Sequence, residues 1–212
     1  MQRLSRLAWA CLAIGAALAT PLTASATYQD RFSMAGSGAA AAFGSCEPSP
    51  AGGQVCTAIS IGVASQITKA DGTKTSETTL SIDIGRFSLD STGAFTFISE
   101  TAGFGVASLS VSPRLSSASA LASFQVITCT VDACADGGTV TVRASWTGQG
   151  DLIHDVSNVH FSKDPFSGNF HANGDVRSAD ATATVNGTDF GASLFASMFN
   201  VKTAAIFICH MC

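Results

Sequence analysis

Hydrophobic residues alternate with polar ones along much of the chain, a pattern typical of half-buried β-strands. The clearest case surrounds Asp71-Gly72, where apolar residues take odd positions before the dipeptide and even positions after it. Asp-Gly between alternating runs predicts a type I′ hairpin, because both turn residues tolerate positive φ. The predicted partners are Val63 and Leu80, Ile61 and Ile82, and Ile59 and Ile84. Every apolar side chain of this hairpin then lies on one face.

The alternation changes phase at Gly85-Arg86, since Phe87 and Leu89 are odd-numbered. A one-residue shift beside a glycine predicts a β-bulge. The next turn is Ser91-Thr92-Gly93, a three-residue loop with glycine in the left-handed position. It predicts two apolar pairs, Phe87 with Phe97 and Leu89 with Phe95.

Two further hairpins, from Leu121 to Arg177, are joined through residues 146–150. The first of these hairpins turns around residues 135–138. If its strands are regular, the apolar residues after the turn lie opposite the apolar residues before it. The predicted partners are then Val140 and Ala133, Val142 and Val131, Ala144 and Cys129, and Trp146 and Ile127. A disulfide between Cys129 and Cys134 conflicts with this pairing. Cα atoms five residues apart in a strand are roughly 16 Å apart, and a disulfide needs about 4.4–6.8 Å. We favour the disulfide, with residues 130–133 as a loop and pairing that begins nearer Ile127.

The second of these hairpins has residues 163–168 as its predicted loop. Matching apolar residues predicts five pairs: Phe161 with Phe170, Val159 with Ala172, His160 with His171, Asn158 with Asn173, and His154 with Arg177. A slip by two residues would change these partners but leave each side chain on the same face.

Near the end of the chain, Leu194, Phe195, Met198 and Phe199 have helical spacing, which predicts a short helix near residues 192–199. Residues 201–209 are predicted to form a last strand. The fold class predicted is all-β, an antiparallel meander of about ten strands. It would pack as a β-sandwich, or alternatively close as a β-barrel. We expect residues 27–212 to form a single domain, because no long linker or break in composition divides them.

Residues 1–26 have the features of a secretory signal: Arg3 and Arg6, an apolar run from Leu7 to Ala19, and Ala24-Ser25-Ala26 as a cleavage site. The apolar run of about 13 residues is shorter than the roughly 20 that a spanning helix needs, which argues against a membrane anchor in place of a signal. No transmembrane segment is expected in the mature chain. Without Arg3 and Arg6 the formal charge becomes 9 − 15 = −6. The few basic residues are scattered, which argues against nucleic acid as a partner.

Six cysteines remain in the mature chain, an even number that predicts disulfides in an oxidising compartment, secreted, periplasmic or extracellular. Cys46 and Cys56 flank a segment rich in turn residues that would bring the two sulfurs together. Cys129 and Cys134 would close the loop described above. Cys209 and Cys212 form a CxxC that would be a local disulfide, a pair of free thiols, or partners of other cysteines.

The predicted opposition of His160 and His171 suggests a metal site, with Asp175 or Asn173 as a third ligand. The ordinary interpretation is that these polar residues simply face outward from a half-buried hairpin, since the spacings of known zinc motifs are absent. Trp146 could stack on a sugar, but its alternation with Val140, Val142 and Ala144 favours the core.

The function expected from the sequence is a non-enzymatic binding or structural module of the cell envelope or extracellular space. Its ligand is unknown and no cofactor is expected. One alternative is a lipocalin-like carrier of a small apolar ligand, which requires an apolar cavity. The other is a hydrolase or metal-binding protein that uses His154, Asp155, His160 and His171.

Overall fold

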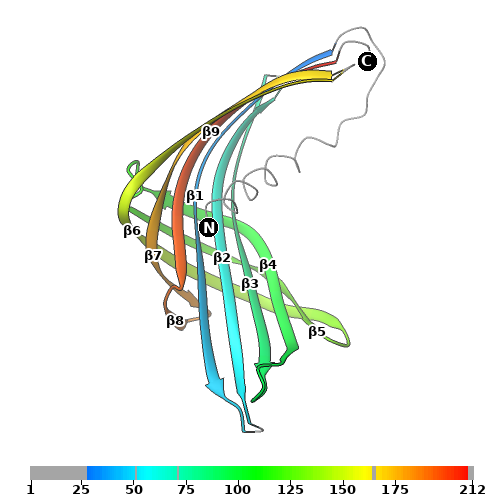
Figure 1. The fold of residues 1–212 in the computed structure, drawn as a ribbon, viewed down its shortest axis with the longest axis vertical. Coiled ribbons are helices and arrows are strands. Elements are labelled where there is room, and N and C mark those ends of the chain that lie inside the picture. The colour runs from blue at the N-terminus through cyan, green and yellow to red at the C-terminus, as the bar shows by residue number, and fades with distance from the viewer. Residues whose placement is uncertain (1–27, 51, 71, 164–165, 210–212) are drawn as a thin grey trace.

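The structure is a computed structural model that describes residues 28–50, 52–70, 72–163 and 166–209. These residues form one antiparallel sheet of nine strands (Figure 1). Their bounds are β1 Tyr28–Pro48, β2 Gln54–Ala70, β3 Thr73–Leu89, β4 Phe95–Val111, β5 Ser117–Thr130, β6 Cys134–Lys163, β7 Phe166–Val185, β8 Thr188–Ala192 and β9 Phe195–Cys209. The predicted signal, residues 1–26, lies outside the described residues.

The strands follow a meander, because each strand from β1 to β7 pairs with the next one along the chain. β9 then inserts between β7 and β1, so the pairings return to their start and form a ring of strands. Among the described strands, β8 pairs only with β7. The predicted all-β antiparallel meander is therefore confirmed.

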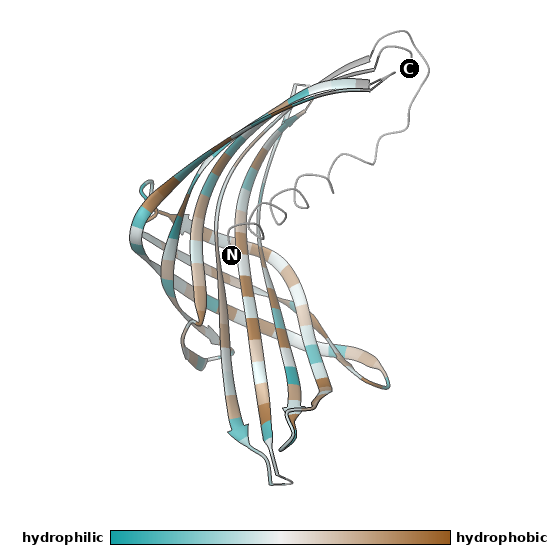
Figure 2. Ribbon diagram, in the orientation of Figure 1, coloured by the Kyte–Doolittle hydropathy of each residue, from teal (hydrophilic) through white to brown (hydrophobic). Residues whose placement is uncertain are grey.

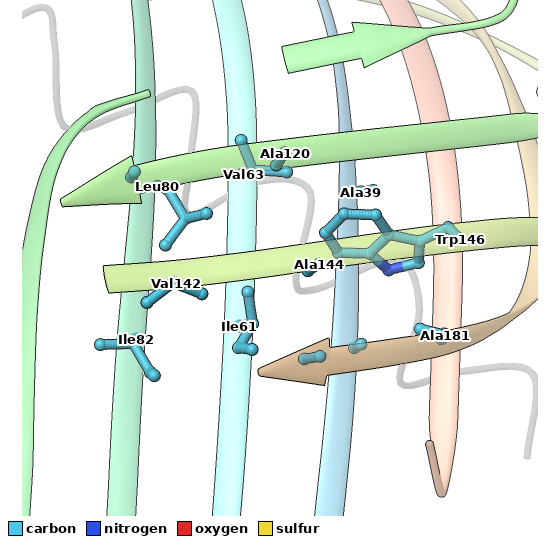
Figure 3. Packing of buried hydrophobic residues seen from close by; sticks show 14 of the residues in the cluster. Ala39, Ile61, Val63, Leu80, Ile82, Ala120, Val142, Ala144, Trp146 and Ala181 are labelled. Atoms are coloured by element: carbon cyan, nitrogen blue, oxygen red, sulfur yellow. The ribbon is translucent and has the colours of Figure 1, made fainter. Parts of the chain in front are cut away.

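In one half of the molecule the two sides of this ring pack against each other. Here β5, the first part of β6 and the last part of β7 cross over β1, β2 and β3, with aliphatic side chains between them (Figure 3). Trp146 is 1% exposed, and its Nε1–H donates a hydrogen bond of 3.0 Å to the carbonyl oxygen of Ala40 on the opposite side. This packed half has the face-to-face layers of a sandwich, and the core position predicted for Trp146 is confirmed.

The remaining half is a single curved layer, which we call the arm. It consists of residues 153–163 of β6, 166–176 of β7, 201–209 of β9, 28–37 of β1, 65–70 of β2 and 73–78 of β3. β6 turns into the arm at a register shift between Gln149 and Ile153, where Gly150 has a φ of 63°. Apolar and polar residues alternate along the strands, as Figure 2 shows. No helix in the described part of the chain is long and apolar enough to cross a membrane.

The hairpin around residues 71 and 72 has the predicted register. Val63 lies opposite Leu80, Ile61 opposite Ile82, and Ile59 opposite Ile84. The bulge predicted beside Gly85 appears as a register shift between Arg86 and Phe87, and Phe87 and Leu89 face Phe97 and Phe95 as expected. Gly93 has a φ of 83°, the left-handed conformation that its loop requires.

The first central hairpin, between β5 and β6, contains the Cys129–Cys134 disulfide and not the regular pairing. Cys129 pairs with Cys134, and the amide of Thr130 donates a 2.8 Å hydrogen bond to Ala133 O across the turn. The partners of regular pairing are therefore wrong, since Val142 faces Ala122 and Trp146 faces Ala118. The predicted Cys46–Cys56 disulfide is also present, between residues directly opposite each other on β1 and β2. Cys212 lies outside the described residues.

The predicted register of the second central hairpin is wrong by two residues. Lys163 pairs with Phe166, so the turn is tighter than the loop of residues 163–168 that we predicted. Val159 consequently faces Phe170, and Phe161 faces Gly168. Matching phenylalanine with phenylalanine failed here because the length of the turn sets the register, but the faces are those predicted.

The predicted helix near residues 192–199 is also wrong. Residues 195–209 are strand β9, with buried Ala196 and Met198 on the inner face and Phe199 on the other. β9 pairs with β1 on one side and β7 on the other, so backbone pairing on both sides outweighs the local helical spacing.

Candidate functional site

Three histidines lie on the inner face of the arm, the face that continues the core of the packed half. Each hydrogen-bonds a polar side chain directly opposite on the paired strand. His154 Nδ1 lies 2.8 Å from Asp175 Oδ1, and His160 Nδ1 lies 2.6 Å from Asn169 Oδ1. His171 Nδ1 makes the same contact with Asn158 Oδ1. These pairs form a ladder along β6 and β7, which we call the histidine ladder.

The His154–Asp175 pair is the charged rung of this ladder. The hydrogen bond from His154 holds the pKa of Asp175 below its usual range, with a smaller contribution from Asn200. Asn200 Oδ1 also accepts a 3.2 Å hydrogen bond from the backbone N–H of Asp175. Asp175 is therefore oriented from β6 on one side and from β9 on the other.

The predicted opposition of His160 and His171 is corrected by this geometry. The two-residue slip makes them diagonal neighbours, and it pairs Asp175 with His154. The described part of the chain contains no group of three His, Cys, Asp or Glu side chains that could hold a metal ion.

The alternative set for a hydrolase or metal-binding protein is not gathered in one place. Asp155 pairs with Gly174 and follows His154 directly in β6, so the two side chains point to opposite faces of the sheet. His154, His160 and His171 share the inner face, spread over seven residues of β6 and its partner strand. The structure thus aligns the three histidines and separates Asp155 from them.

A groove of about 530 Å³ lies beside the charged rung, between the arm and Pro113. Its polar lining includes Asn173, Asn200 and Lys202 together with His154 and Asp175. In the described structure the side chains of Asn173 and Lys202 make no hydrogen bond or ion pair, whereas the side chain of Asn200 is engaged with Asp175. The groove therefore presents hydrogen-bond donors that remain free for a ligand.

A second concavity, of about 550 Å³, lies on the outer face of the packed half. Serine and threonine side chains of β4 to β7 line it, with Arg143 among them and Asp189 of β8 beside them. Sequence reasoning missed this surface. Its signal was present in the polar positions of β5, β6 and β7, which are mostly hydroxyl residues, but only the structure shows which of them are neighbours.

Both concavities are open grooves lined by polar as well as apolar residues, and the space between the packed sides of the ring is filled by side chains (Figure 3). Comparison with models of known protein families found no match, and comparisons with curated proteins and with solved structures found none either.

Proposed function

We propose that the protein is an exported, non-enzymatic binding module that holds a polar ligand, of the saccharide class, in the groove beside the histidine ladder. Export is supported by the signal-like residues 1–26 and by two disulfides, which are compatible with an oxidising environment. The module acts in the periplasm, the cell envelope or the extracellular space.

The observation that carries this proposal is the combination of fixed and free polar groups in one groove. Asp175 is held by His154 and Asn200, so its position is set before a ligand arrives. The amide of Asn173 and the ammonium of Lys202 are free to donate to ligand oxygens. Pre-oriented groups reduce the entropy lost on binding, and a few well-placed polar groups fix a ligand's orientation.

The experiment is a glycan-array screen of the mature protein, followed by calorimetry with the glycans that bind. Asn173→Ala should weaken binding by about twofold to tenfold, because a lost hydrogen bond costs about 0.5–1.5 kcal/mol. Lys74→Ala is the matched control, since Lys74 is exposed on β3 of the arm and does not line the groove. The absence of any glycan ligand, or unchanged binding by Asn173→Ala, would refute the proposal.

A further inference from the structure

The outer face of the packed half carries hydroxyl groups in register across four strands. Ser110 of β4 lies opposite Ser119 of β5, Ser119 opposite Ser145 of β6, and Ser145 opposite Thr182 of β7. Ser145 Oγ and Thr182 Oγ1 are 2.9 Å apart. Neighbouring strands are about 4.8 Å apart, so this row offers a regular series of groups that each donate and accept hydrogen bonds.

Arg143 stands in the next row of the same surface. It is flanked by Leu121 of β5 and Thr184 of β7, and it lies two residues before Ser145 on the same face of β6. No carboxylate of the described structure lies within ion-pair distance of its guanidinium. Asp189, across the concavity, accepts a 2.8 Å hydrogen bond from the backbone of Gly191 through Oδ1. The guanidinium is thus an exposed cation, among hydroxyls, with five donors and no acceptor.

We infer that this outer concavity binds a carboxylate-bearing polysaccharide. The planar guanidinium of Arg143 matches a carboxylate in bidentate geometry, a match that an isolated ammonium lacks. The hydroxyls of Ser145, Thr182 and Thr184 suit the hydroxyls of the sugar ring, and the second oxygen of Asp189 accepts from one of them. The chain is net acidic, with a formal charge of −4, so recognition depends on these local contacts rather than on long-range attraction.

This site lies on the opposite surface of the sheet from the groove of the histidine ladder and does not depend on it. A test uses calorimetry of the mature protein with polygalacturonate, with neutral dextran, and with acetate alone. We expect binding of polygalacturonate, weaker or no binding of dextran, and no binding of acetate at the same concentration of carboxylate. Arg143→Gln should weaken polygalacturonate binding about tenfold or more, because hydrogen bonds between charged groups are the stronger ones.

Arg86→Gln is the matched control, since it removes one positive charge from an exposed position on β3 outside the concavity. It should leave binding unchanged. Equal binding of dextran, an equal loss in Arg86→Gln, or no binding of polygalacturonate would each overturn the inference. Circular dichroism and the melting temperature of Arg143→Gln should match those of the parent protein, because the side chain is exposed.

Discussion

Trp146 is a single residue that joins the two packed sides of the ring. It is the largest fully buried side chain in the part of the chain that the structure describes, and its indole N–H donates a hydrogen bond to the carbonyl oxygen of Ala40 on the opposite side. We expect Trp146→Ala to lower the free energy of unfolding by about 3–5 kcal/mol, because it leaves a cavity between the layers. Urea unfolding under oxidising conditions measures this loss. The fluorescence of the mature parent protein should be blue-shifted, and a maximum near that of free indole in water would contradict the burial.

The carboxyl groups of Asp83 and Glu100 interact on the surface, and the pKa of Glu100 is raised rather than lowered. A hydrogen bond with Asp83, and then repulsion by its charge, raise the pKa of Glu100. A raised pKa in the folded state means that the folded protein binds this proton more tightly than the unfolded chain does. The resulting stabilisation is fully present below the unfolded-state pKa and is lost as the pH rises through the folded-state pKa.

Glu100→Gln removes this repulsion at neutral pH. We expect the variant to be more stable than the parent at about pH 7 and equally stable at about pH 3, because the parent is already protonated there. Urea midpoints at the two pH values provide the comparison. Glu77→Gln, at an exposed position of β3, serves as the control. A variant less stable than the parent at neutral pH would show that the Asp83–Glu100 contact is favourable when both groups are charged.

At the scale of the hairpin, the sequence predicts most where turn chemistry is strict. Asp71-Gly72 and Gly93 allow only a narrow set of turns, and the registers on either side follow from them. The turn between β6 and β7 has no such signal, so the register predicted there was wrong by two residues. His160 and His171 are therefore not directly opposite each other. The histidine ladder could be predicted as a shared face, but its Asn and Asp partners could not.

The two disulfides that the described residues contain differ in the length of chain that they close. Cys46 and Cys56 are 10 residues apart, whereas Cys129 and Cys134 are 5 apart. Closing a longer loop removes more entropy from the unfolded chain, by about 0.6 kcal/mol for each doubling. We expect the double variant Cys46→Ser and Cys56→Ser to be less stable than the double variant Cys129→Ser and Cys134→Ser.

Urea unfolding of the two double variants tests this order. The burial of Cys56, which is 1% exposed, adds to the loss at the first site because a serine hydroxyl there is desolvated. The reverse order, or equal midpoints, would mean that residual structure in the unfolded chain, rather than loop length, controls the effect.

At the scale of the whole molecule, the closing of the ring was beyond sequence reasoning. The insertion of β9 between β7 and β1 depends on pairings between residues more than 150 positions apart, such as Ala39 with Met198. Local periodicity carries no information about such partners. The concavity around Arg143 could not be predicted from the sequence for the same reason. Its row of hydroxyl groups forms only when β4, β5, β6 and β7 are aligned in the sheet.

The two halves of the ring should differ in local stability, and β6 allows the comparison within one strand. Residues 140–147 of β6 pair with β5 and alternate between buried and exposed side chains, and residues 142–147 pair with β7 as well. Residues 153–163 pair only with β7 in the described structure, and Ile153 is 61% and Val159 50% exposed. Few buried contacts and one free edge predict low free energies of local opening.

Hydrogen exchange followed by mass spectrometry measures this difference in the mature, oxidised protein. Peptides covering residues 153–163 of β6 and 73–78 of β3, the two free edges of the arm, should exchange by local opening within minutes. Peptides covering residues 140–147 should exchange only through global unfolding, and so respond to Trp146→Ala, whereas the arm should not. Equal protection of both parts of β6 would mean that the arm is covered by another surface in solution, and protection that rises with protein concentration would identify that surface as a second copy of the chain.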